Sequence, residues 1–174
     1  MKTKAFIITI LIAMLSVNLS AQEGIFYERH GGTLNLGVGI GGYDYYYHTS
    51  PVFNVNYEFG VARNFTLAPF ATIYSYADAN YRETVIPIGV KGTIYLDQLL
   101  RAGSNWDFYT AGSLGFSLVT TTWDANYPGD RTYYHEAGPL YLDFHLGTEY
   151  HLSRNLGIFL DLSTAVSTIG IAIH

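Results

Sequence analysis

Residues 140–147, Leu-Tyr-Leu-Asp-Phe-His-Leu-Gly, place an apolar side chain at every second position. The same alternation occurs in residues 34–41, Leu-Asn-Leu-Gly-Val-Gly-Ile-Gly, and in residues 53–61, Phe-Asn-Val-Asn-Tyr-Glu-Phe-Gly-Val. Successive side chains of a β-strand point to opposite faces, so this period predicts strands with one apolar face and one polar face. We therefore expect an all-β protein.

Eight segments of the chain carry this signal, and we expect strands near residues 33–42, 52–62, 65–76, 84–96, 106–121, 139–152, 156–164 and 168–174. Most of these lengths suit a tilted strand that crosses a bilayer, which needs about 9–11 residues. Short turns at 63–64 and 153–155 alternate with longer connections at 43–50, 77–83 and 122–138. Short turns at one end and long loops at the other are typical of outer-membrane barrels. The connection 97–105 is longer than a turn, and we expect a helical turn at 98–101.

The first 21 residues predict an export signal that is cleaved. Lys2 and Lys4 precede an apolar segment at 6–17, and Leu19-Ser20-Ala21 is a small-residue cleavage site. Residues 22–174 then form one mature barrel domain. The sequence contains no Cys, which excludes a disulfide framework and a thiolate metal site. It has no basic patch, which argues against nucleic acid as a partner.

Aromatic residues gather near the ends of the expected strands. Amphipathic rings prefer the boundary between membrane and water, so we expect two aromatic girdles. The expected members at the end with long loops include Tyr74, Tyr76 and Trp123. Those at the other end are Phe59, Phe65, Tyr95, Trp106, Phe108 and Tyr150.

The mature chain resembles the small outer-membrane β-barrel proteins of Gram-negative bacteria, broadly the OmpA-barrel, OmpX and OmpW type. The segments that carry the resemblance are 34–42, 51–60 and 155–162. It implies an eight-stranded antiparallel up-and-down transmembrane β-barrel in the outer membrane. It also implies contact with outer-membrane lipid and lipopolysaccharide, and insertion by the barrel-assembly machinery. Such proteins usually end in an aromatic residue, whereas this sequence ends Ile171-Ala172-Ile173-His174.

The polar face of the expected strands carries a small set of charged and titratable side chains. The interior of an eight-stranded barrel is just wide enough for side chains to fill. Buried charges need partners, so we expect a polar network that plugs the lumen. Its predicted members are Glu58, Lys91, Asp143, His145, Glu149 and Asp161.

No motif in the sequence predicts a catalytic, cofactor-binding or metal-binding residue. His145 and His151 share a strand face with Glu149, but a third metal ligand at a recognisable spacing is missing. Ser113 and His145 with an acid allow a lipid-modifying outer-membrane enzyme as an alternative. We expect no cofactor and no enzymatic activity.

The tyrosine-rich loops are the remaining candidates for function. Tyrosine supplies contact area at low entropic cost, so these loops are suited to binding an extracellular protein or glycan. The predicted contact residues are Tyr45, Tyr46, Tyr47, Trp123, Tyr133 and Tyr134. We expect a monomeric outer-membrane barrel with a structural, envelope-integrity or surface-contact role. The alternative is a soluble periplasmic or secreted barrel that carries a hydrophobic ligand, with Leu36, Val55, Ile88 and Leu142 facing inward.

Overall fold

The computed structural model describes residues 32–41, 51–77, 80–100, 103, 105–129, 131 and 139–174. The predicted export signal at 1–21 lies outside the described residues. So do five of the predicted contact residues, Tyr45, Tyr46, Tyr47, Tyr133 and Tyr134.

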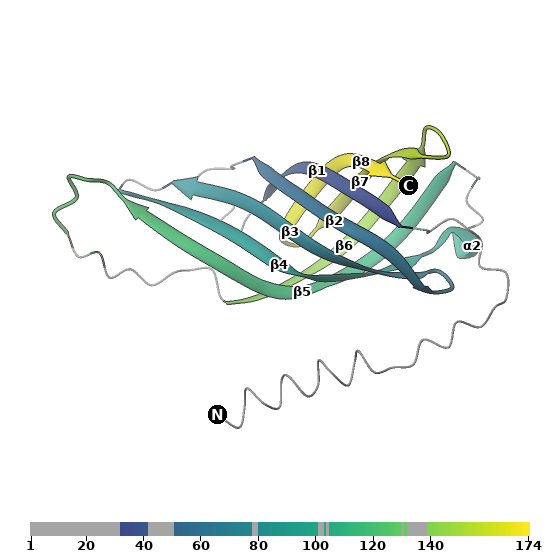
Figure 1. Ribbon diagram of the computed structural model, residues 1–174, viewed down its shortest axis with the longest axis horizontal. Coiled ribbons are helices and arrows are strands. Elements are labelled where there is room, and N and C mark those ends of the chain that lie inside the picture. Colours follow the sequence, from purple (N-terminus) through teal and green to yellow (C-terminus); the bar gives the residue numbers. More distant parts are fainter. Residues whose placement is uncertain are drawn as a thin grey trace, which may run out of the picture.

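Eight antiparallel strands form one closed barrel (Figure 1). Each strand pairs with its neighbours in the sequence, and β1 pairs with β8 to close the sheet. The predicted eight-stranded antiparallel up-and-down barrel is therefore confirmed. The strands are β1 (Thr33–Gly41), β2 (Val52–Ala62), β3 (Phe65–Ala77), β4 (Tyr81–Tyr95), β5 (Trp106–Trp123), β6 (Leu140–His151), β7 (Leu156–Ser163) and β8 (Val166–Ile173).

The barrel has a short-turn end, where β2 meets β3 and β6 meets β7, and an opposite long-loop end. At the short-turn end, Asn64 has a φ of 60° in the β2–β3 turn, a conformation that Asn tolerates. The helix α2 (Asp97–Leu100) lies at the same end and corresponds to the expected helical turn. Among the described residues, no helix combines the length and the apolar character that a membrane crossing requires.

One predicted loop is wrong. Residues 77–83 were expected to form a long connection, but β3 and β4 pair as far as Ala77 and Arg82, which leaves only 78–80 between them. The physical reason is Glu83, which points inward and accepts hydrogen bonds from Tyr76 and from Thr121 at 3.0 Å. Because these donors satisfy the buried Glu83 carboxylate, β3 and β4 stay paired through the segment that was expected to be a loop. β4 and β5 therefore reach beyond the other strands at the long-loop end (Figure 1).

The alternation of side chains gives the barrel an apolar outer face. Leu36, Val55, Ile88 and Leu142 are each at least 40% exposed. A soluble barrel with an apolar interior would bury these four side chains, so the structure contradicts that alternative. An apolar exterior around a polar interior is instead the arrangement that lipid requires.

Aromatic rings form a band on the outside of the short-turn end. The Trp106 ring lies 4.8 Å from the Tyr150 ring and 6.1 Å from the Phe108 ring, measured between centroids. The structure contradicts the expected girdle positions of Tyr74, Tyr76 and Tyr95: Tyr74 and Tyr95 are buried inside the barrel, and Tyr76 is partly buried against the same interior. All three occupy inward positions of the alternation, and the hydroxyls of Tyr76 and Tyr95 donate hydrogen bonds to carboxylates there.

Charged substitutions on the outer face test whether it contacts hydrocarbon. We expect Leu142→Arg, on β6 opposite Leu114 near the middle of β5, to lower the free energy of unfolding in lipid vesicles by about 2–4 kcal/mol. Leu152→Arg, in the β6–β7 turn, is the matched control because the two leucines are 50% and 53% exposed. It should cost about 0–1 kcal/mol. Urea titration of the vesicle-inserted barrel measures both values. Equal and small costs would contradict a membrane-facing belt.

Candidate functional site

The six residues predicted for a polar network all point into the barrel. Five are buried, and His145 is partly buried. They belong to four groups. The first group lies in the middle of the lumen, the second lies near the β7–β8 turn, and the other two lie at the short-turn end. The six are Glu58, Lys91, Asp143, His145, Glu149 and Asp161. Two further buried carboxylates, Glu83 and Asp107, also face the interior.

The central group is built on an ion pair. The Lys91 ammonium contacts the Asp161 carboxylate from β4 to β7, across the lumen. It also lies 5.0 Å from the centroid of the Tyr109 ring, and the Tyr109 hydroxyl donates to Asp161 at 3.1 Å. A buried charge without such partners is strongly destabilising, so these contacts hold Lys91 inside the barrel.

Asp161, His145 and Ser113 form a hydrogen-bonded chain. His145 Nδ1 is 2.8 Å from Asp161 Oδ1, and His145 Nε2 is 2.8 Å from Ser113 Oγ. The order is that of an acid–histidine–serine triad. The cavity beside it measures about 20 Å³, room for about one water molecule. An acyl substrate does not fit against this serine.

Asp143 organises the connection between β7 and β8. Its carboxylate accepts hydrogen bonds from Ser163 Oγ at 2.9 Å, Thr164 Oγ1 at 2.8 Å and the Ala165 amide at 2.9 Å. The Tyr141 hydroxyl donates to it at 3.0 Å. Four donors satisfy this buried carboxylate and fix a tight turn at the long-loop end.

Glu58 forms one of the groups at the short-turn end. Its carboxylate accepts hydrogen bonds from the Tyr95 hydroxyl at 2.6 Å and from the Thr66 hydroxyl. The Asn35 amide donates to it at 3.4 Å. These partners come from β1, β3 and β4, so Glu58 links four consecutive strands on the inner face of the barrel.

Glu149 forms the other group, with two histidines. His174 Nε2 donates to Glu149 Oε1 at 2.8 Å, and His151 Nδ1 lies 3.7 Å from the same oxygen. On its other side, His151 Nε2 donates to Asp107 Oδ2 at 2.7 Å. His174 follows the last residue of β8, and its hydrogen bond with Glu149 raises the pKa of the imidazole, although partial burial opposes the rise.

Sequence reasoning missed three members of the interior: Glu83, Asp107 and His174. Each occupies a position at which the alternation along the chain points the side chain into the barrel. Asp107, for example, alternates in step with the buried residues Tyr109 and Ser113 of β5. Extending the period of two to the strand ends would have found them. The contact of His174 with Glu149 needs the paired register of three strands, which no local pattern shows.

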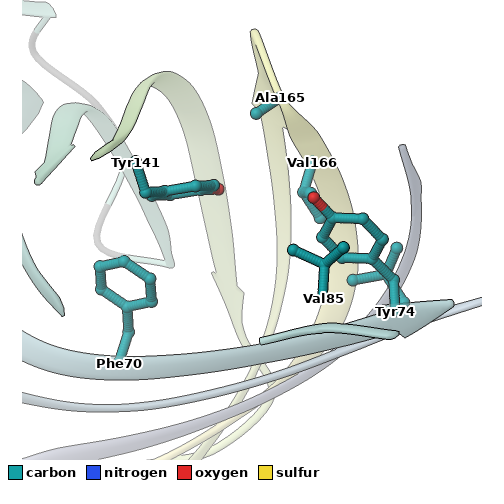
Figure 2. Close-up of a cluster of buried hydrophobic side chains, with 7 residues drawn as sticks. Phe70, Tyr74, Val85, Tyr141, Ala165 and Val166 are labelled. Atoms are coloured by element: carbon teal, nitrogen blue, oxygen red, sulfur yellow. The ribbon is translucent and has the colours of Figure 1, made fainter. Parts of the chain in front are cut away.

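An apolar layer fills the lumen toward the long-loop end. Figure 2 shows the Tyr141 ring facing the Phe70 ring, whose centroids lie 5.7 Å apart. Tyr74 lies beside Val85 and Val166 in the same view. The full cluster contains Val52, Phe70, Tyr74, Val85, Tyr141, Ala165 and Val166.

Of the six predicted contact residues, the structure describes Trp123. Its ring stacks on the Tyr127 ring with centroids 5.3 Å apart and an interplanar angle of 12°. The Tyr81 ring packs against it at 5.2 Å. These rings form an aromatic cluster at the tip of the β4–β5 extension.

Comparisons with known proteins add little beyond the barrel architecture. No family model matches this sequence. No curated protein matches it either. A de novo designed transmembrane β-barrel has a TM-score of 0.49 and 11% identity, over 82% of this chain and 92% of that chain.

Ail, the attachment invasion locus protein of Yersinia pestis, has a comparable TM-score and sequence identity to this chain. Its crystal structure has a TM-score of 0.46 and 8% identity, over 82% of this chain and 95% of that chain. Its structure in a phospholipid bilayer nanodisc has a TM-score of 0.45 and 10% identity, over 82% and 98%. The resemblance to the OmpA, OmpX and OmpW type stays a prediction, because no family model supports it.

Removing Lys91 tests whether the central ion pair holds the lumen together. We expect Lys91→Met to destabilise the barrel by about 3–5 kcal/mol, because it removes the cation that is paired with the buried Asp161 carboxylate. The double variant Lys91→Met with Asp161→Asn should recover most of that loss. Urea unfolding of the wild type, the Lys91→Met and Asp161→Asn single variants and the double variant in vesicles gives the coupling energy. If the two substitutions are simply additive, the ion pair does not have this role.

Proposed function

We propose that this chain is a monomeric barrel of the Gram-negative outer membrane with a closed lumen and no catalytic activity. Its role is structural or one of surface contact. The proposal is supported by the combination of an apolar exterior, typified by Leu142 and Phe144, with buried charges inside, typified by Lys91 and Asp161. A water-soluble protein instead exposes its charged side chains and buries most of its leucines.

The observation that carries the closed lumen is its filling by side chains. The polar network occupies the middle and the short-turn end, and the apolar cluster around Tyr141 and Phe70 occupies the long-loop end. The interior voids beside these groups measure about 20 and 10 Å³. Voids of this size hold single waters. This favours a scaffold or contact protein over a porin.

The surface-contact role is supported by the β4–β5 extension. It carries the Tyr81, Trp123 and Tyr127 rings beyond the rest of the barrel. Aromatic rings that stack at the ends of two paired strands provide a pre-organised surface for a protein or glycan partner. Outer-membrane lipid and lipopolysaccharide would surround the belt beneath it.

Cell fractionation with a gel shift tests the location. We expect the mature chain in the outer-membrane fraction, extracted by detergent, and migrating faster before boiling than after. This behaviour follows from a barrel that stays closed in detergent until it is heated. Recovery as a freely soluble periplasmic protein would overturn the proposal.

Planar bilayer recording tests the closed lumen. We expect the wild-type barrel to give no conductance steps of porin size, since side chains fill the proposed closed lumen. The double variant Phe70→Ala with Tyr141→Ala should conduct more, because it removes the rings that close the long-loop end. Stable open steps from the wild-type protein would show that the lumen is not plugged.

The acid–histidine–serine chain makes a lipid-modifying enzyme the second candidate. We expect His145→Asn to leave the lipid A profile of the cell unchanged, because no substrate fits beside Ser113. Mass spectrometry of extracted lipid A, with and without expression of each form, measures this. A modification that the wild type produces and His145→Asn does not would establish the enzyme.

A further inference from the structure

Glu149, His151 and His174 converge at the short-turn end of the lumen. Each offers one ligand atom, and these atoms lie within 4.8 Å of one another. His174 Nε2 and His151 Nδ1 lie 2.8 and 3.7 Å from Glu149 Oε1. The ligand atoms of a tetrahedral zinc ion are about 3.3 Å apart, so modest side-chain movement would bring all three to one ion.

Both imidazoles are held from behind by a second partner. His151 Nε2 donates to Asp107 Oδ2 at 2.7 Å, which fixes the proton on Nε2 and turns the Nδ1 lone pair toward Glu149. His174 Nδ1 lies 3.0 Å from Thr33 Oγ1. A hydroxyl both donates and accepts, so Thr33 can accept from Nδ1–H while Nε2 binds a metal. Outer partners of this kind orient the histidine ligands of zinc proteins.

The backbone provides room for the three ligands to meet. β7 lies between β6, which carries Glu149 and His151, and β8, which precedes His174. Gly157 on β7 leaves the space through which the Glu149 carboxylate reaches His174, because a Cβ at Gly157 would overlap that carboxylate.

The main chain also holds His174 in place. The His174 amide donates to the Asn155 carbonyl at 3.2 Å. The Asn155 side-chain amide donates to the His174 carbonyl at 3.4 Å. Both contacts fix the imidazole next to the β6–β7 turn, and so its position does not depend on the Glu149 contact alone.

We propose that Glu149, His151 and His174 bind a divalent transition-metal ion, with Zn²⁺ as the chemistry they fit best. Two imidazole nitrogens and one carboxylate oxygen form a common zinc ligand set, whereas Ca²⁺ and Mg²⁺ require mainly oxygen ligands. Water would take the fourth position. His151 and His174 are 18% and 15% exposed in their side chains, so an ion can reach them from the short-turn end.

The bound ion would join β6 to the end of β8, next to the seam between β8 and β1. Thr33, at the start of β1, already contacts His174, so the ion would tie together the strands that close the barrel. Because an ion that binds only the folded barrel stabilises it by mass action, metal should raise resistance to unfolding. This inference does not depend on the proposed envelope role.

Titration of the folded barrel with cobalt and zinc tests the site. The protein is purified in detergent micelles without a histidine tag and is stripped of metal with a chelator. We expect one equivalent of Co²⁺ to bind with the visible absorption of a tetrahedral site, and Zn²⁺ to displace it. Binding should also raise the urea midpoint of unfolding. Absence of stoichiometric binding would overturn the proposal.

Variants identify the ligands. We expect His174→Ala, His151→Ala and Glu149→Gln to abolish or strongly weaken binding, and Asp107→Asn to weaken it about 10–100-fold through His151. His145→Gln is the control, because it removes a different lumen histidine and should leave binding intact. The gel shift on boiling confirms that each variant is folded.

Two further substitutions keep the proposal testable if a histidine variant fails to fold. His174→Cys should retain binding and add a thiolate-to-cobalt charge-transfer band, since cysteine is also a zinc ligand. Gly157→Ala keeps all three ligands but displaces the Glu149 carboxylate, so it should weaken binding. If His174→Cys binds cobalt without a thiolate band, or if His145→Gln is the only variant that loses binding, the site lies elsewhere.

Discussion

Closure of the sheet between β1 and β8 is the constraint on which the rest of this structure depends. A closed antiparallel sheet pairs every strand on both sides, which is what a bilayer demands of a β-protein. Closure also separates two environments along every strand. Each residue faces either the exterior or a narrow interior, and the period of two in the sequence assigns it to one of them.

Charged and polar side chains are excluded from the apolar exterior, and so they lie in the interior. Among the described residues, six buried carboxylates and one buried lysine share this space with partly buried histidines. Hydroxyl groups from Tyr, Ser and Thr supply many of the donors that these carboxylates need. Asp143 illustrates the principle, because hydroxyl and amide groups donate four hydrogen bonds to it, whereas the nearby His145 Nε2 lies 3.7 Å away. The lumen network and the tight β7–β8 turn are therefore one structural feature.

The sequence predicted the strands well, because alternation of apolar and polar residues is a local signal that survives in the fold. The predictions were wrong or incomplete where a side chain suits both the exterior and the interior, or where the hydrogen-bond partners come from distant strands. Tyr74 and Tyr95 were expected outside because tyrosine suits the membrane boundary, but the same hydroxyl also suits a carboxylate-lined interior. The β4–β5 extension depends on Glu83 and its partners on two other strands. His174 meets Glu149 only through the register of β6, β7 and β8.

The central claim is that the outer face of the barrel contacts hydrocarbon. The sequence has no cysteine, so single cysteines can be introduced and spin-labelled without background. The most direct measurement is the collision of labels at Leu142, Phe144, Leu146 and Leu152 with oxygen, which enters lipid, and with a water-soluble nickel chelate. The account predicts high oxygen and low nickel accessibility at the first three positions, and the reverse at Leu152. High nickel accessibility at Leu142, Phe144 and Leu146 in a vesicle-inserted, folded barrel would contradict it.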